Sequence, residues 1–203
     1  MSDRFRLPHV ALMLALLALA GCAGPTPPEH FYRLPTPEVA AGGQILDGGM
    51  NIALLRTDPV HEDRAMLFSD DPEGLRLEQY RYNHWTANTP DLLRAFMLRY
   101  LRQVGVADWV APADQGRDAT YELVGRLLRF ERHSHAGRHT VVVRMELELL
   151  DRDRRPLGLH REYEQVQELN GDQPLDMARG LRTALAAVMT RFIDDLKRQR
   201  TRP

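Results

Sequence analysis

The stretch "HTVVVRMELELLD", residues 139–151, alternates apolar and charged side chains and decides the fold of this chain. A repeat of two residues is typical of a β-strand that buries one face and exposes the other. The sequence therefore predicts a strand here, with its apolar face on a hydrophobic core. The residues expected to point inward are Val141, Val143, Met145, Leu147 and Leu149, and those expected to point outward are Arg144, Glu146 and Glu148.

Strand-like segments flank this stretch on both sides. Residues 119–135, "ATYELVGRLLRFERHSH", alternate in the same way, but the alternation slips near Leu127 and Leu128, which indicates a β-bulge. Residues 159–168, "LHREYEQVQE", are more polar, and this composition favours a strand near an edge of the sheet or at an interface. Short turns separate the three segments, so we expect neighbouring strands to pair antiparallel.

The N-terminal half of the chain contains shorter strand candidates, separated by loops rich in proline and glycine. They are residues 30–34, 50–57, 65–70 and 75–85. Residues 71–74, "DPEG", form a tight turn between the last two candidates, which predicts a hairpin. The nearly continuous apolar run in residues 50–57 indicates a strand that is buried on both faces.

Two segments change to the 3.6-residue period of an amphipathic helix. In the first, Thr89 is the expected N-cap, Pro90 the first helical residue and Gly105 the end. The apolar face of this helix consists of Leu93, Phe96, Met97, Tyr100, Leu101 and Val104. The second helix runs from Leu175 to about Arg198, and its apolar stripe consists of Leu175, Ala178, Leu181, Leu185, Val188, Phe192 and Leu196.

Together these segments predict an α+β fold, in which a mostly antiparallel β-sheet is packed by two amphipathic helices. The chain has no internal repeat, and without an export signal its length is that of a single domain. We expect a lipoprotein signal peptide over residues 1–21, a lipidated cysteine and proline-rich tether over residues 22–29, and one α+β domain over residues 30–203.

The N-terminus has the pattern of an export signal. Arg4 and Arg6 precede an uncharged run, residues 10–20, which is too short to span a membrane. Three prolines follow closely, at positions 25, 27 and 28. They argue against the alternative of a buried N-terminal helix with a cysteine in the core, because proline cannot continue a helix.

Cys22 is the single cysteine, so the chain cannot form an internal disulfide. Leu19, Ala20, Gly21 and Cys22 form a motif that resembles the lipobox of bacterial lipoproteins. The resemblance implies that signal peptidase recognises the first three residues and that the Cys22 sulfur carries a diacylglycerol. Two or more acyl chains, such as palmitate, would then hold the protein firmly to a membrane. Ala23 is not the aspartate that retains lipoproteins in the inner membrane, so the resemblance favours the periplasmic face of the outer membrane.

The charge balance and the motifs argue against several classes of function. The chain has 27 basic and 28 acidic residues, a formal net charge of −1, which does not favour binding to nucleic acid. It contains no nucleophile elbow, phosphate-binding loop or zinc-protease motif. The sequence therefore predicts a protein that is not an enzyme and needs no cofactor or metal.

Three histidines lie close together in the sequence, at His133, His135 and His139. His133 and His135 would share one face of a strand and could bind a metal ion together. The alternative is the polar tip of a hairpin. We favour this alternative because Glu131 is the nearest carboxylate and the cluster itself contains no acidic ligand.

Two pairs of acidic residues, Asp70–Asp71 and Asp194–Asp195, raise the alternative of acid–base catalysis. The first pair lies at a turn, where aspartate commonly accepts backbone hydrogen bonds. The second pair lies late in the second helix and flanks its apolar stripe. We therefore favour structural roles for both pairs.

Residues 80–85, "YRYNHW", concentrate aromatic side chains, and we name Tyr80, Tyr82 and Trp85 as candidate residues of a partner interface. For Trp85 we favour a place in the core under the start of the first helix. For Tyr80 and Tyr82 the sequence does not decide between core and interface. The basic C-terminal tail, residues 197–203, is expected to fray in solvent, with contact to a partner or to lipid headgroups as the alternative.

Several residues occur in a characteristic order, namely Tyr32 and Leu34 in the first strand, then Pro59, Arg64, Trp85 and Pro90. This order, over residues 31–105, resembles the ABC-type transport auxiliary lipoproteins, which include the paraquat-inducible lipoprotein C group. The chain departs from the family pattern after Phe68, where a second arginine is common, and after Trp85, where a small residue and an acid are common.

The resemblance implies a non-enzymatic accessory protein of the outer membrane. Its expected partners are an inner-membrane ABC transporter and an Mce-domain protein, whose channel carries phospholipid and would dock at this subunit. Some members of the family assemble into rings, so a homo-oligomer is also expected. One alternative is an assembly factor that supports an outer-membrane β-barrel, and another is a lipid-tethered hydrolase.

Overall fold

Three long strands form the largest part of the sheet, and they are the segments whose alternation is clearest in the sequence. In the computed structural model, β6 (Tyr121–His135), β7 (Arg138–Asp151) and β8 (Pro156–Glu168) pair antiparallel in chain order. The register of β6 shifts between Leu127 and Arg129, which confirms the predicted bulge. The five apolar residues of β7 that we expected to point inward are all buried, so the predicted inward face is confirmed.

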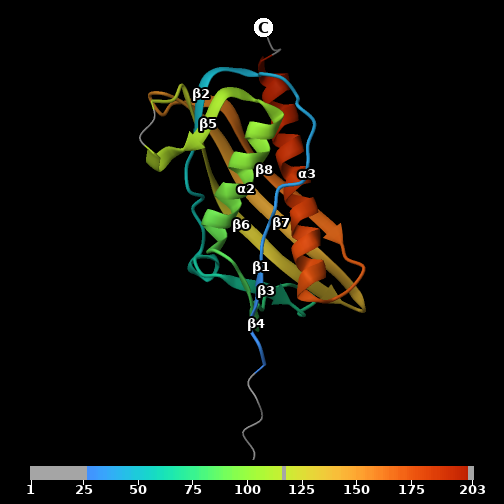
Figure 1. Ribbon diagram of the computed structural model, residues 1–203. Helices are drawn as coiled ribbons and strands as arrows, with labels where there is room; N and C mark the ends of the chain where they lie inside the picture. The colour runs from blue at the N-terminus through green and yellow to red at the C-terminus, as the bar shows by residue number, and fades with distance from the viewer. Residues whose placement is uncertain (1–26, 116–117, 201–203) are drawn as a thin grey trace, which may run out of the picture.

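The structure describes residues 27–115 and 118–200. The shorter elements are β1 (His30–Tyr32), β2 (Leu46–Ile52), the 3-10 turn η1 (Pro59–His61), β3 (Ala65–Ser69), β4 (Glu78–Trp85), β5 (Ala107–Pro112) and the 3-10 turn η2 (Ala113–Gln115). All eight strands belong to one sheet. The described residues also form two helices, α2 (Thr89–Val104) and α3 (Pro174–Arg200) (Figure 1). The α+β class and the two helices are therefore confirmed.

The sheet is mixed, with fewer antiparallel pairs than expected. Three pairs are antiparallel, including the predicted β3–β4 hairpin, and four are parallel. The long strand β6 explains the parallel pairs at its other edge. Residues 121–123 of β6 pair with β2, and residues 131–133 pair with β3, so two short strands follow one another along a single long one.

The helix boundaries follow local capping. Asn88, not the predicted Thr89, is the N-cap of α2, and its side-chain oxygen accepts a hydrogen bond from the Asp91 amide at 2.9 Å. Gly105 ends the helix at φ 74°, a left-handed conformation that glycine adopts without a steric penalty, as predicted. In α3 the predicted apolar stripe is buried except for Leu175, which is 48% exposed.

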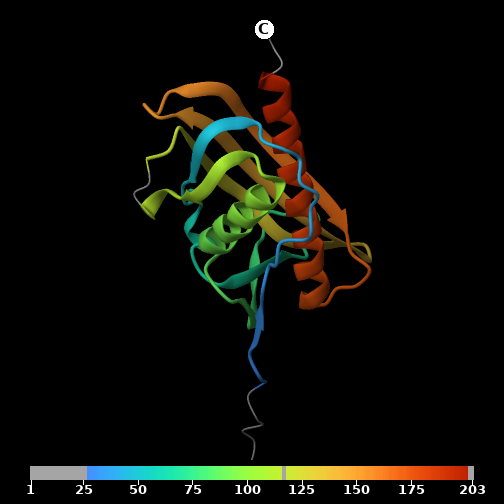
Figure 2. The ribbon, with the colours of Figure 1, turned by 45° about the horizontal axis from the view of Figure 1, so that its top comes forward.

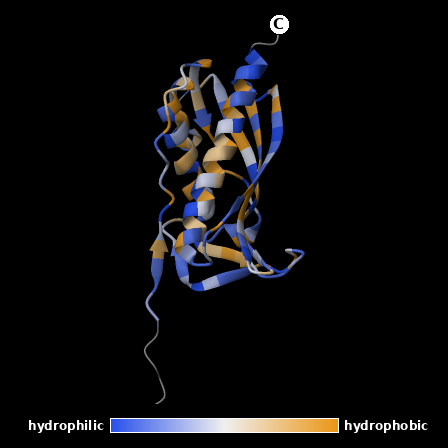
Figure 3. Cartoon of the chain, turned by 90° about the vertical axis from the view of Figure 1, so that its right-hand side faces the viewer, coloured by the Kyte–Doolittle hydropathy of each residue, from blue (hydrophilic) through white to orange (hydrophobic). Residues whose placement is uncertain are grey.

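The two chain ends of the described structure lie at opposite ends of the molecule (Figures 1 and 2). The N-terminal chain leaves beside β1, β3 and β4, and the last turn of α3 lies at the far end. Both helices cover one side of the sheet, and apolar and polar residues alternate along the strands (Figure 3). We call β1, β3, β4 and the turn of residues 70–77 the tether end.

Candidate functional site

The predicted lipidation motif, Leu19 to Cys22, lies outside the described residues. Pro27, the first described residue, lies three positions before the start of β1. β1 lies at the tether end, so the described chain enters the domain there (Figure 1). The predicted C-terminal tail lies partly in α3, and its residues 201–203 are outside the described residues.

Trp85 lies in the core, as the favoured alternative for this residue predicted. Its side chain is 0% exposed, and its ring lies 5.7 Å from that of Phe130 on β6, measured between centroids. Its backbone amide donates a hydrogen bond to the Arg64 carbonyl at 2.7 Å. Trp85 is therefore not available to a partner, and its place among the interface candidates is wrong because the hydrophobic core takes up its whole side chain.

The Tyr80 side chain makes its contacts within the protein. Its ring lies 4.6 Å from that of Phe68, and the Arg132 guanidinium lies over both rings, 5.2 Å from Phe68 and 5.5 Å from Tyr80. Arg132 is held there by Asp70 at 3.0 Å and by the Asp172 carbonyl at 2.7 Å. Burial raises the pKa of the Tyr80 hydroxyl above its usual value, so the group stays protonated.

Tyr82 is the interface candidate that remains. It is half-buried, and the guanidinium of the exposed Arg81 lies 5.4 Å from the centre of its ring. Tyrosine and arginine are enriched at protein interfaces, so this pair can serve a partner.

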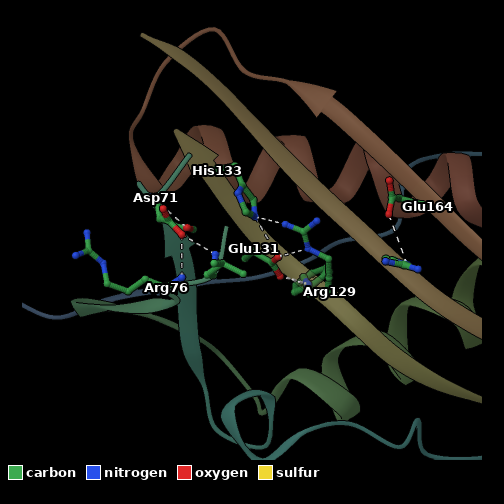
Figure 4. A network of polar contacts seen from close by, with 10 residues as sticks. Asp71, Arg76, Arg129, Glu131, His133 and Glu164 are labelled. Atoms are coloured by element: carbon green, nitrogen blue, oxygen red, sulfur yellow. Dashed lines mark hydrogen bonds and ion pairs between the residues drawn. The ribbon is translucent and has the colours of Figure 1, made fainter. Parts of the chain in front are cut away.

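Of the three histidines, only His133, near the end of β6, joins the polar network shown in Figure 4. The His133 ring nitrogen Nε2 lies 3.2 Å from a Glu131 carboxylate oxygen and also contacts Arg129. His139 bonds instead to the Ser134 hydroxyl at 2.7 Å, and His135 is exposed. Within residues 27–115 and 118–200, no three histidine, cysteine or acidic side chains are arranged to hold a metal ion.

Glu131 is a buried carboxylate that periodicity did not identify. It accepts hydrogen bonds from the Arg129 guanidinium and the Phe130 amide, both at 2.6 Å. Burial acts to raise its pKa, but the hydrogen bonds from His133 and Arg129 outweigh burial and hold the pKa below its usual value. Glu131 is thus ionised at neutral pH, and its bonds fix the end of β6.

The Asp70–Asp71 pair has structural partners, as we favoured. Asp71 accepts hydrogen bonds from the amides of Leu75 at 2.6 Å and Arg76 at 3.2 Å (Figure 4). The bond from Leu75 is the main reason that the pKa of Asp71 lies below its usual value. These bonds shape the turn between β3 and β4.

The two residues of the Asp194–Asp195 pair have different environments. Asp194 is exposed, whereas Asp195 is buried and joins α3 to β8. Arg161 and the Tyr163 hydroxyl donate to Asp195 at 2.9 Å, and Arg198 donates at 2.5 Å. Burial acts to raise the pKa of Asp195, but the bonds from Arg198 and Tyr163 outweigh it and lower that pKa.

Two open grooves could receive another molecule. One, of about 430 Å³, lies between residues 54–57 and the start of α2, and Leu54 in its wall is 46% exposed. The other, of about 400 Å³, lies between residues 38–42 and the two helices, beside a 2.8 Å hydrogen bond that joins Tyr100 and Thr190. Neither α2 nor α3 is both long and apolar enough to cross a membrane.

Residues 63–192 match the model of a family described as the ABC-type transport auxiliary lipoprotein component. None of the curated proteins that were compared matches this chain. The matched region begins two residues before β3 and extends through most of α3.

Two crystal structures share the fold. A protein from Xanthomonas campestris superposes with a TM-score of 0.71 at 17% sequence identity, covering 85% of this chain and 99% of its own. A second structure, of an uncharacterized protein, has a TM-score of 0.66 at 13% identity and covers 84% of this chain and 99% of its own. At these identities the likeness concerns the fold alone.

Proposed function

This chain belongs to the family of ABC-type transport auxiliary lipoprotein components, and we propose that it is a non-enzymatic accessory subunit of a system that moves lipid between membranes. The match over residues 63–192 is the observation that carries the proposal, because it covers most of the domain. In the proposal, the subunit docks the channel of an Mce-domain protein at the outer membrane, and this protein works together with an inner-membrane ABC transporter.

The anchor of this subunit is the lipid proposed for Cys22, after recognition of Leu19, Ala20 and Gly21 by signal peptidase. Ala23 supports placement at the periplasmic face of the outer membrane. The direction in which the described chain leaves the domain supports a geometry in which the tether end lies nearest to that membrane (Figure 1).

A docking role agrees with the structural contacts that the buried charged residues make. Glu131, Arg132 and Asp195, the buried charged residues of the described chain, are all bound to partners that hold strands and helices together. The candidate contact residue for a partner is Tyr82, beside Arg81. Further copies of this chain could add to the same assembly as a homo-oligomer.

Affinity purification of the full lipidated protein from gently solubilised membranes tests the proposal. A tag at the C-terminus is suitable because α3 ends far from the tether end (Figure 1). We expect mass spectrometry to identify an Mce-domain protein and the ABC transporter components. The matched control is the Cys22→Ser variant, which cannot take the lipid and should recover neither. Recovery of a β-barrel alone would overturn the proposal and favour the role of a barrel assembly factor.

A further inference from the structure

Leu75 is the most exposed of the large hydrophobic side chains in the described structure. It is 82% exposed, against 37% to 50% for the other five in this group. It lies in the turn of residues 70–77 between β3 and β4, which Figures 1 and 2 both place at the tether end. An isolated exposed leucine is common on protein surfaces, so its significance depends on what holds it there.

The turn is built to keep Leu75 in this position. The Asp71 carboxylate accepts hydrogen bonds from the amides of Leu75 and Arg76, and the Gly74 amide donates to the Asp71 carbonyl at 3.0 Å. Gly74 has a φ of +69°, a left-handed conformation that favours glycine. Because local bonds fix the backbone, Leu75 is presented to the outside without a further cost in chain entropy when it meets a partner.

A second exposed apolar side chain lies next to the N-terminal chain. Phe31 in β1 is 50% exposed, and the Arg64 guanidinium lies 5.7 Å from the centre of its ring. Phe31 pairs with His84 near the end of β4, whereas Leu75 precedes the start of the same strand. The two apolar side chains therefore mark the two ends of the β3–β4 hairpin.

We propose that Leu75 and Phe31 contact the surface of the bilayer in which Cys22 is anchored, and that this contact fixes the orientation of the domain. The inference rests on the lipid proposed for Cys22. Phe31 lies nine positions after Cys22, which limits their separation to about 32 Å even for a fully extended chain. A lipid anchor of this reach keeps the tether end close to the membrane surface.

The size of the contact suits an orienting role. Burial of one leucine or phenylalanine side chain contributes too little free energy to hold a soluble protein on a membrane. The anchor raises the local concentration of the bilayer, so the same small contribution can select one orientation of a tethered domain. The turn of residues 70–77 contains three acidic residues, Asp70, Asp71 and Glu73, and one basic residue, Arg76, so its net charge is −2. Because anionic headgroups repel this charge, we expect the contact to be apolar and to strengthen when salt screens the repulsion.

A fluorescent label can test this orientation, since Cys22 is the single native cysteine and its sulfur would be occupied by lipid. Leu75→Cys introduces a labelling site in the turn. The matched control is Asp153→Cys, in the β7–β8 turn, where the native side chain is 67% exposed. This turn lies at the far end, because the nearby Leu157 carbonyl accepts a hydrogen bond from Gln199 near the end of α3.

Both full-length lipidated variants are placed in vesicles of phosphatidylethanolamine and phosphatidylglycerol that contain a lipid with a quencher near its headgroup. We expect severalfold stronger quenching of the label at position 75 than at position 153, and a weaker difference after Phe31→Ser. Equal quenching at both positions would overturn the inference. Burial of the label at position 75 only when a partner protein is added would overturn it as well. Labelling of the unmutated chain would show a free Cys22 thiol, and this result would reject the proposed anchor rather than the contact alone.

Discussion

Asp195 shows how neighbouring residues of the same type take different roles. Asp194 faces solvent, whereas the Asp195 side chain is 7% exposed and binds Arg161, Tyr163 and Arg198. Helical periodicity places Asp195 beside the apolar stripe of α3. It does not reveal that Arg161 and Tyr163, about thirty residues earlier in β8, meet it, because this contact depends on how α3 packs on the sheet.

We expect Asp195→Asn to lower the free energy of unfolding by about 2 kcal/mol, because it weakens charge-assisted hydrogen bonds to a buried group. The lowered pKa of Asp195 contributes stability that is complete above pH 3.8, the usual value, and is lost as the pH falls through the folded pKa. The variant should lose this part of the acid dependence. Urea unfolding at several pH values measures both effects, and Asp194→Asn, in the exposed neighbour, should change neither.

His61 is a buried histidine in η1, and neither ring nitrogen has a hydrogen-bond partner among the described residues. Burial lowers its pKa, and this outweighs the opposing charges of Glu131 and Asp58. The folded protein therefore favours the neutral ring. This contribution to stability is complete above pH 6.5, the usual value, and is lost as the pH falls through the lower folded pKa.

We expect His61→Leu to remove this pH dependence and to leave stability at pH 7 unchanged or slightly higher. Leucine has a similar size and leaves no polar atom unpaired in the core. Thermal unfolding between pH 7 and pH 5 measures the loss of stability in the native chain, which can reach about 1.4 kcal/mol for each unit of pKa shift. The control is His160→Gln on the exposed face of β8. A variant that stays as sensitive to pH as the native chain would contradict this assignment.

At the scale of elements, the clearest patterns in the sequence gave correct strands and helices. The alternation in β7, the slip in β6 and Gly105 at the end of α2 all depend on neighbours in the chain. β5 was missed, and β2 ends at Ile52 rather than at the predicted position 57. These short segments gain their strand structure from parallel pairing with distant parts of the chain, which local periodicity does not record.

The start of α2 offers a test of local capping. We expect Asn88→Ala to lower the free energy of unfolding by about 1 kcal/mol, because the amide of Asp91 loses its hydrogen-bond acceptor. Thr86→Ala, at an exposed position shortly before the helix, should have little effect. Chemical unfolding of the two variants beside the native chain compares them directly. Equal losses in both would show that Asn88 does not cap the helix.

At the scale of the whole molecule, the order of elements gives the domain two distinct ends. The tether end contains β1, the β3–β4 hairpin and the exposed Leu75, and α3 ends at the opposite side (Figure 1). The sequence correctly predicted the fold class and the family, and the lipid anchor on Cys22 stays a prediction. It favoured the core for Trp85 but could not decide between core and interface for Tyr80 and Tyr82, because their environment depends on packing between distant strands.

The mass of the N-terminal peptide tests most directly the lipid anchor on which the proposed location, partners and orientation all depend. The protein is purified from separated inner and outer membranes and digested before mass spectrometry. We expect the mature peptide to begin at Cys22, to carry a diacylglycerol on the sulfur, and to come from the outer membrane. A peptide that begins elsewhere, or a Cys22 with a free thiol, would contradict the lipid-anchored role.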